Sequence, residues 1–101
     1  MSRPTCPRNI RHTPPSDYFK PAGVPLRDME EVVLGSDELE AMRLADAGGM
    51  YHVEAAKHMG VSRQTFDRIV KSARSKVAKA LCGGMALKIE RSAAPERPDE
   101  T

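Results

Sequence analysis

The strongest constraint on the fold lies in residues 52–71, where small and apolar residues recur at helical spacing on both sides of Gly60. Two helices that cross through a short turn need a small residue where they touch, a glycine in the turn and a shared apolar face. Ala56 is the small residue, and Gly60 lies where the turn must be. The positions that would face the shared core are Ala55, Met59, Val61, Phe66, Ile69 and Val70. The pattern predicts a helix-turn-helix.

The second helix of this motif is predicted to span residues 62–81. Ser62 is a good N-cap, because its hydroxyl can accept a hydrogen bond from the N–H of Gln64 or Thr65. The apolar face continues beyond the motif through Ala73, Val77, Ala80 and Leu81. Gly83-Gly84 then ends the helix, since glycine readily adopts the left-handed conformation that often follows a helix.

The side of this helix opposite Phe66 is basic and polar. At 100° per residue, that side carries Gln64, Arg68, Lys71 and Ser75, flanked by Arg63, Asp67 and Arg74. A solvated face usually mixes both signs of charge, whereas Asp67 is the single acid here. An ordinary helical hairpin is the alternative interpretation, but the composition favours a helix that meets a polyanion.

The net charge of +2 conceals an uneven distribution of charged residues. Residues 1–27 contain five bases and one acid, residues 28–46 one base and seven acids, and residues 47–81 seven bases and two acids. Positive charge therefore lies on the motif and on the N-terminal arm, where a polyanion would bind. The acidic stretch between them argues against general adhesion to membranes or polyanions.

The N-terminal arm, residues 1–35, is predicted to be extended and to pack on the helical core. Six of the eight prolines of the chain lie in residues 1–27, and proline blocks helix and removes a backbone donor. A solvated linker would not need the apolar residues of this arm, which are Ile10, Tyr18, Phe19, Val24 and Leu26. We interpret Tyr18 and Phe19 as core anchors, with a base-stacking platform as the alternative.

A first helix is predicted from Ser36 to Gly48-Gly49. Asp37 and Glu38 in its first turn suit the positive end of the helix dipole, and the two glycines end it. Its apolar stripe comprises Leu39, Ala41, Met42, Leu44 and Ala45 or Asp46. We attribute the carboxylates of Asp37, Glu38 and Glu40 to capping and solubility, because their spacing spreads them around the helix axis and does not suit a metal or catalytic site.

The fold class expected from these elements is mainly α, with a three-helix helix-turn-helix core in residues 36–90. Residues 86–90 alternate apolar and polar side chains like a strand, and residues 8–11 are a second strand candidate. Their pairing would give a small two-stranded sheet that joins the two ends of the domain. Residues 91–101 lack an apolar anchor and are expected to be disordered.

No metal, cofactor or catalytic residue is expected. Cys6 and Cys82 are far apart in sequence and are interpreted as reduced thiols of a cytoplasmic protein. The start of the chain lacks the apolar segment of a signal peptide, and no apolar run is long enough to span a bilayer. A metal site formed by Cys6, His12 and Cys82 would match no known spacing. A chain of this size also leaves little room for an enzyme cleft.

Part of the chain resembles the fourth region of sigma factors, the region that reads the upstream promoter element. The matching residues are Ser36-Asp-Glu-Leu-Glu-Ala-Met-Arg-Leu44, Ala55-Ala56 and Gly60-Val-Ser-Arg-Gln-Thr-Phe-Asp-Arg-Ile69. This resemblance covers about residues 36–81 and implies a DNA-binding helix-turn-helix. The chain lacks the regions that melt a promoter or bind core polymerase, so we do not expect it to act as a sigma factor alone.

Nearly the whole chain is similar to a small uncharacterised family of predicted prokaryotic DNA-binding proteins. The residues that carry this similarity are Arg3-Pro-Thr-Cys-Pro-Arg8, Tyr18-Phe-Lys-Pro-Ala-Gly-Val-Pro25 and Asp37-Glu-Leu-Glu-Ala-Met-Arg-Leu-Ala-Asp46. Some members of that family carry an added domain like those that bind iron-molybdenum cofactor. No such domain follows in this sequence, which agrees with the expectation of no cofactor.

We therefore expect a sequence-specific, double-stranded DNA-binding protein, a transcriptional regulator that acts as a homodimer on two half-sites. The recognition helix 62–81 would contact bases, since arginine suits guanine, glutamine suits adenine, and threonine suits a thymine methyl or a phosphate. The expected base contacts are Arg63, Gln64, Thr65 and Arg68, and the expected phosphate contacts are Lys57, Ser62, Lys71, Arg74, Arg3, Arg8 and Arg11. The alternative is a protein-interaction adaptor that docks on RNA polymerase or another transcription factor through the acidic helix 36–46.

Overall fold

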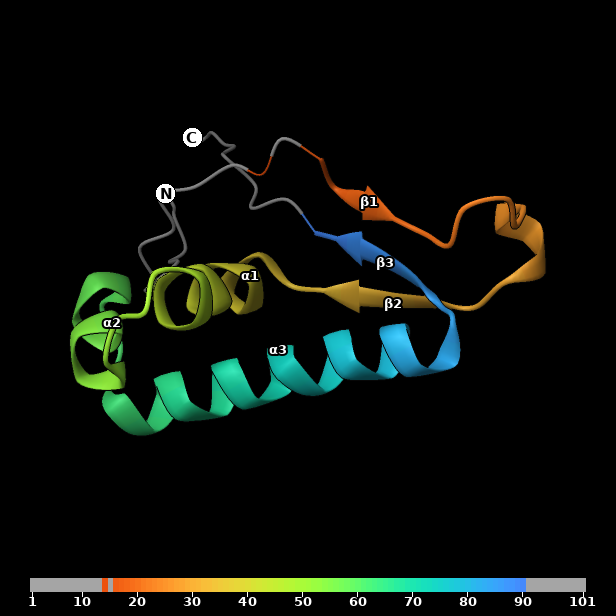
Figure 1. Cartoon of the computed structure of the whole chain (residues 1–101). Coiled ribbons are helices and arrows are strands. Elements are labelled where there is room, and N and C mark those ends of the chain that lie inside the picture. Colours follow the sequence, from red (N-terminus) through yellow and green to blue (C-terminus); the bar gives the residue numbers. More distant parts are fainter. Residues whose placement is uncertain (1–13, 15, 91–101) are drawn as a thin grey trace, which may run out of the picture.

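The structure is a computed structural model that describes Pro14 and residues 16–90 (Figure 1). The described part is mainly helical and contains a small sheet. Its helical elements are a 3-10 helix η1 (Leu26–Asp28), α1 (Ser36–Met42), a π-helical segment η2 (Arg43–Ala47), α2 (His52–Met59) and α3 (Arg63–Gly83). Its strands are β1 (Tyr18–Phe19), β2 (Glu31–Leu34) and β3 (Ala86–Ile89).

The described strands form one sheet in the order β1-β3-β2, with β3 in the centre (Figure 1). β1 runs antiparallel to β3, whereas β2 runs parallel to it. The predicted strand at residues 86–90 is therefore confirmed, but the expectation of a sheet with two strands is wrong, because β1 and β2 both pair with β3. The other strand candidate, residues 8–11, and the predicted disordered tail, residues 91–101, lie outside the described residues.

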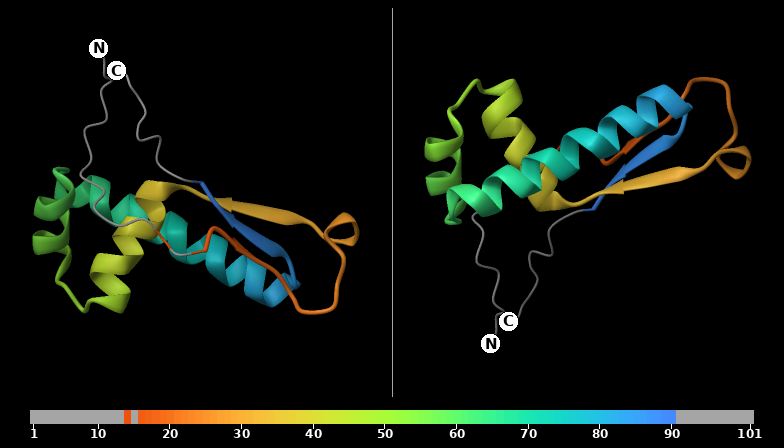
Figure 2. Two further views of the ribbon diagram at one scale, coloured as in Figure 1. Left: turned by 90° about the horizontal axis from the view of Figure 1, so that it is seen from above. Right: turned by 90° about the horizontal axis from the view of Figure 1, so that it is seen from below.

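α3 connects two apolar clusters. In the first cluster it packs with α1, η2 and α2 through Phe66, Ile69 and Val70, whose burial was predicted. Farther along, Ala73 packs with buried residues of β2 and β3. Figure 2 shows α2 beside the N-terminal end of α3 and the strands beside its C-terminal half. The other buried members of the first cluster are Ala41, Leu44, Ala55, Ala56 and Met59.

The turn between α2 and α3 is fixed by its backbone. Gly60 adopts the left-handed conformation, with φ 71° and ψ 32°, which residues with a side chain rarely adopt. The N–H of Val61 donates to the carbonyl of Ala56 at 3.0 Å, and Val61 packs against the first cluster. The Ser62 hydroxyl accepts a hydrogen bond from the N–H of Thr65 at 3.1 Å, which confirms the predicted N-cap.

The observed helix boundaries lie close to the predicted ones. α1 begins at Ser36, and after Met42 the chain continues to coil as the π-helical η2. Gly48 follows η2 directly, and a Cβ atom at this position would lie 2.9 Å from a backbone carbonyl oxygen. α3 ends at Gly83, two residues beyond the predicted end at Leu81.

Glu38 of α1 is only 8% exposed, so its attribution to solubility is wrong. It caps α1, because its carboxylate accepts a hydrogen bond from the N–H of Gly35 at 2.7 Å. The same carboxylate accepts hydrogen bonds from two side chains of α3, Lys76 at 2.8 Å and Ser72. Glu38 therefore joins the start of α1 to the middle of α3.

Glu40 is 2% exposed, so it does not serve solubility either. The guanidinium of Arg43 donates two hydrogen bonds to this carboxylate, both at 2.8 Å. This bidentate geometry offsets part of the cost of burying a carboxylate. The hydrogen bonds to Glu40 raise the pKa of Arg43, and the pair lies where α1 passes into η2.

Two residues predicted to lie in the core are exposed. Phe19 is 53% exposed and Leu81 is 77% exposed, so their interpretations as a core anchor and as part of the buried stripe are wrong. Tyr18 is half-buried, and its hydroxyl donates to a carboxylate of β2. α3 packs along β2 and β3, which leaves Phe19 on β1 at the margin of the apolar cluster. Val24 and Leu26 of the arm are also exposed.

The contacts of Glu38 make the fold sensitive to acid. Burial opposes ionisation of this carboxyl, but hydrogen bonds from Lys76, Ser72 and the Gly35 N–H outweigh it, so the pKa of Glu38 is lowered. A carboxyl with a lower pKa in the folded than in the unfolded protein stabilises the fold above the unfolded pKa. This contribution is lost as the pH falls through the folded pKa.

We expect Glu38→Gln to lower the free energy of unfolding by about 1–3 kcal/mol at neutral pH, because the hydrogen-bonded, ionised acceptor is lost. The variant should also lose less stability than the wild type between neutral pH and about pH 3. Urea unfolding at several pH values measures both effects. Glu54→Gln, at an exposed position of α2, is the matched control and should follow the wild-type profile. If the free energy of unfolding of Glu38→Gln fell with pH in parallel with that of the wild type, Glu38 would not be the cause of the acid sensitivity.

Candidate functional site

The outer face of α3 is a surface of exposed polar side chains. It comprises Gln64, Arg68, Lys71 and Ser75, with Arg63 at its flank. The first four lie opposite Phe66, Ile69 and Ala73, which are buried. Helical periodicity therefore predicted the exposure of this surface correctly, and it brings two expected base contacts, Gln64 and Arg68, onto one side of the helix with Arg63 beside them.

A short chain of hydrogen bonds runs through the first turn of α3. The Ser62 hydroxyl donates to Thr65 Oγ1 at 3.0 Å, and Arg68 Nη2 donates to the same oxygen at 3.4 Å. Thr65, the fourth expected base contact, is half-buried, whereas Ser62 and Arg68 are exposed. The guanidinium of Arg68 is therefore held near the start of α3, with further N–H groups available for another acceptor.

Asp67, the single acid among residues 62–75, is paired with neighbours. His52 Nδ1 lies 2.8 Å from Asp67 Oδ1, and Arg63 Nε lies 3.8 Å from Asp67 Oδ2. The ring of His52 also meets Phe66 edge-on, with ring centroids 5.1 Å apart. Because His52 is the first residue of α2, these contacts tie α2 to α3 beside the outer face.

Arg74, an expected phosphate contact, is bound by Asp46. Its Nη2 and Nε donate to the Asp46 carboxylate at 2.7 and 3.1 Å. Both side chains lie near the surface, with exposed fractions of 49% and 39%. Their hydrogen bonds lower the pKa of Asp46 and raise the pKa of Arg74. A phosphate that binds Arg74 would therefore have to compete with Asp46 for this guanidinium, a competition that the sequence did not indicate.

Besides Arg74 and Ser62, whose hydroxyl is hydrogen-bonded to Thr65, the expected phosphate contacts fall into two groups. Lys57 on α2 and Lys71 on α3 are exposed, and neither forms an ion pair with another described residue. The three residues of the arm lie outside the described part of the chain, and these are Arg3, Arg8 and Arg11. The candidate site in the described residues is therefore the outer face of α3 with its neighbours at the turn and on α2.

Among Pro14 and residues 16–90, no group of three His, Cys, Asp or Glu side chains could hold a metal ion. Cys82 has an exposed free thiol, while Cys6 and His12 lie outside the described residues. The helices in this part of the chain are also too short or too polar to cross a membrane.

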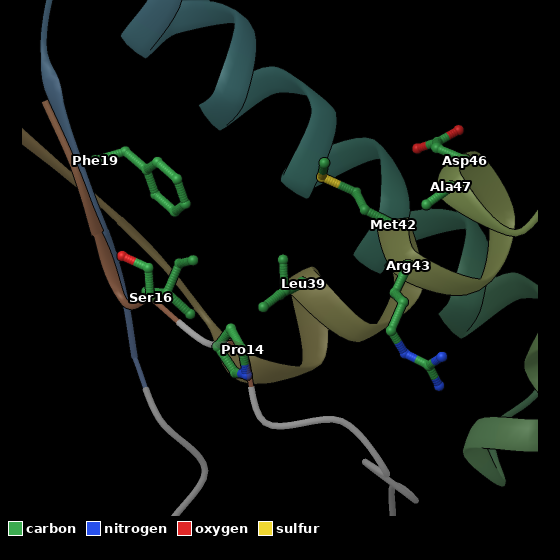
Figure 3. Close-up of a pocket in the computed structure, with 9 residues that line it drawn as sticks. Pro14, Ser16, Phe19, Leu39, Met42, Arg43, Asp46 and Ala47 are labelled. Atoms are coloured by element: carbon green, nitrogen blue, oxygen red, sulfur yellow. The ribbon is translucent and has the colours of Figure 1, made fainter. Parts of the chain in front are cut away.

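Two hollows beside α1 were missed by sequence reasoning. The α1–sheet groove has a volume of about 500 Å³ and is lined mainly by apolar side chains, with Phe19 and Leu39 facing each other across it (Figure 3). A smaller, more polar hollow of about 260 Å³ lies between α1 and the outer face, beside Thr65 and Arg68. Each hollow is formed by segments that are distant in the chain, so local patterns do not reveal it.

A known protein family matches nearly the whole chain. Residues 1–93 match the family described as "Protein of unknown function DUF134". The chain belongs to this family. The DUF134 match includes the arm, the α1–sheet groove and the outer face of α3, so all three are parts of one family domain.

The DUF134 chain is also similar to curated relatives named "UPF0251 protein". It is 54% identical over 90 residues to the relative from Desulfosudis oleivorans, 53% over 90 residues to that from Moorella thermoacetica, and 51% over 88 residues to that from Methanosarcina acetivorans. These alignments cover 89%, 89% and 87% of this chain and 65%, 60% and 79% of the relatives. The chain thus spans less than two thirds of the length of the first two. No solved structure matches the DUF134 chain.

Ser62→Ala should destabilise the DUF134 fold, because it removes the acceptor that caps the N–H of Thr65. Loss of a serine N-cap costs about 1 kcal/mol. The matched control is Ser75→Ala, an exposed position inside α3 where alanine is the better helix former. Urea unfolding followed by circular dichroism compares the two variants, and equal stabilities would contradict the capping role of Ser62.

Proposed function

We propose that this protein binds double-stranded DNA in a sequence-specific manner through α3 and acts as a transcriptional regulator. The observation that carries the proposal is the outer face of α3, where basic and amide side chains are exposed on a helix whose opposite side is anchored in the core. The major groove of DNA is wide enough to admit one such helix. α2, the turn at Gly60 and α3 would form the helix-turn-helix motif, as in the sigma-factor region that the sequence resembles.

Base edges would be read by side chains in the first two turns of α3. Gln64 suits adenine, and Arg63 and Arg68 suit guanine, since each can form two parallel hydrogen bonds with its base. The Thr65 hydroxyl already accepts a hydrogen bond from Arg68, so we assign it the task of orienting Arg68 in addition to any contact with a thymine methyl or a phosphate. Arg63 is similarly close to Asp67. Such contacts reduce the entropic cost of ordering the two arginines on DNA.

Phosphates would be bound by exposed side chains around the outer face. Lys71 on α3, Lys57 on α2 and Ser62 at the turn are the candidates in the described residues. Arg74 would join them in competition with Asp46, which already accepts hydrogen bonds from two of its nitrogens. Contacts with phosphates fix the position of a protein on the duplex without reading its sequence.

A homodimer is part of the proposal, because one recognition helix reads only a few base pairs. Two copies would contact half-sites about 34 Å apart, one turn of the DNA helix. Two short half-sites together specify a longer sequence, which a genomic regulator needs in order to find its site among many competitors.

The alternative, an adaptor that docks on RNA polymerase or another transcription factor, would use α1 as an acidic contact. Glu38 and Glu40 are buried, and Asp46 binds Arg74. Most carboxylates of this helical segment therefore already have partners inside the protein. This observation weakens the alternative and favours α3 as the functional surface.

Selection from a randomised duplex pool at several salt concentrations tests the proposal. Specific binding would enrich one motif, with an affinity that falls steeply as salt rises. Arg68→Ala should cost roughly 1–3 kcal/mol of binding free energy through one base position. Lys71→Ala should weaken binding to all sequences alike. It should also reduce the salt slope, which is the steepness with which the logarithm of the affinity falls with the logarithm of the salt concentration, by about 1. The absence of an enriched motif, together with loss of binding at physiological salt, would rule out groove reading by α3.

Asp46→Asn should strengthen DNA binding, because it releases Arg74 for a phosphate. We expect a higher affinity for every sequence and a salt slope steeper by about 0.9, the change for one added phosphate contact. The gain should vanish when Asp46→Asn is combined with Arg74→Ala. Glu54→Gln, which removes one exposed carboxylate from α2, controls for the change in net charge. An equal gain in this control would mean that Arg74 is not the cause.

A further inference from the structure

None of the described residues covers the α1–sheet groove, an apolar surface in a domain with few large apolar residues. Phe19, Leu39, Met42 and Ile89 line it, and Figure 3 shows the side chains of Phe19 and Leu39 pointing into it. Phe19 is 53% exposed as a result. A contiguous apolar hollow of about 500 Å³ marks a place where another segment or molecule packs, because water solvates such a surface poorly.

The segment that precedes the described residues starts at this groove. Pro14 and Asp46 both line the groove, and Figure 3 shows them at opposite ends of it. Ile10 precedes Pro14 by four residues, which reach about 13 Å when extended. The distance along the helix from Leu39 to Asp46 is roughly 10 Å, at 1.5 Å per residue. Residues 1–13 are therefore long enough to cover the groove.

The composition and charge of residues 1–13 complement the groove. Ile10 is the only Ile, Leu, Val or Phe among them, and it lies between Arg8 and Arg11. With Arg3, these residues give the segment three bases and no acid, a net charge of +3. Residues 36–47 contain four acids and one base, a net charge of −3. Opposite charges on the segment and on the helical wall of the groove favour their contact.

The family match adds an independent argument. It begins at residue 1, so the segment is part of the family domain and not an appendage to it. We propose that residues 1–13 occupy the α1–sheet groove of their own molecule, with Ile10 between Phe19 and Leu39. Arg8, six residues before Pro14, then reaches toward the end of the groove at Asp46.

This arrangement assigns the arginines of the arm to the α1 side of the protein. They then stabilise the fold and do not hold DNA phosphates, which leaves the outer face of α3 and its neighbours to bind DNA without the arm. The inference goes beyond the proposed function, and it holds whether or not α3 binds DNA.

A nitroxide spin label on Cys6 tests the placement in the full chain. Cys82→Ser leaves Cys6 as the single cysteine for labelling. The methyl NMR signals of Leu39 and Ile89 report on the groove. Those of Leu26 serve as the internal reference, because Figure 1 shows η1 at the opposite end of the molecule from α1. We expect the label to broaden the signals from the groove and to leave those of Leu26 sharp. The same protein with a diamagnetic label is the control, and absent or uniform broadening would overturn the proposal.

A mixing experiment shows whether the segment that fills the groove belongs to the same molecule or to a second copy. Spin-labelled chains without isotopes are mixed with isotope-labelled chains that carry no spin label. We expect no broadening in the mixture, because each groove is filled by its own segment. Broadening that appears between chains would assign the groove to a dimer contact and overturn the proposal.

Substitution of Ile10 provides a second readout that needs no label. Ile10→Ser should lower the melting temperature by several degrees, because it places a hydroxyl in an apolar groove. Ile10→Val, the matched control, should lower it much less, since only one methylene is lost. Equal melting temperatures for the wild type and both variants would mean that Ile10 is not in the groove.

The effect of added DNA shows whether the arm stays in the groove or leaves it to bind phosphates. Added duplex DNA should leave the broadening by the Cys6 label unchanged, and the double variant Arg8→Ala with Arg11→Ala should keep the wild-type salt slope. Release of the arm on DNA, with a smaller salt slope in that variant, would assign the arginines to phosphates and overturn the proposal. If the protein bound no DNA at all, the proposed function would fail, and the broadening in the free protein would still decide where the arm lies.

Discussion

The packing of one long helix against two apolar clusters is the constraint on which the rest of the structure depends. The first part of α3 buries Phe66 and Val70 against α1 and α2. Farther along, Ala73 lies against the sheet, and its small side chain lets the helix approach the strands closely. Because the inner side of α3 is used in both clusters, its remaining surface is left to solvent and carries the polar side chains of the outer face.

Two carboxylates fix the position of the helical segment after β2, which consists of α1 and η2, against α3. Glu38 binds Lys76 near the start of this segment, and Asp46 binds Arg74 near its end. The segment is therefore attached to α3 by ion pairs at both of its ends. Much of the acidic charge of residues 28–46 has partners within the fold, so the basic character of the protein is expressed mainly at the surface of α3.

Local features were predictable because their causes act over a few residues. The left-handed Gly60, the cap at Ser62 and the buried side of α3 follow from turn chemistry, capping and helical periodicity. The partners of Glu38 lie 34 and 38 residues away in sequence, and no local pattern indicates them. The same limit applied to the candidate site, where the outer face was predicted but the pairing of Arg74 with Asp46, 28 residues away, was not. Contacts between distant segments require the topology of the sheet and helices, which spacing alone does not supply.

β2 and β3 are parallel neighbours, so the helices between them form one crossover connection that must return the chain to the start of β3. α3 makes this return, and its 21 residues are held by the turn at one end and by the sheet at the other. Each residue added to α3 would turn its two ends by about 100° relative to each other. The number of residues in α3 therefore sets the direction in which the outer face points relative to the sheet, and geometry permits changes in helix length only in steps close to whole turns.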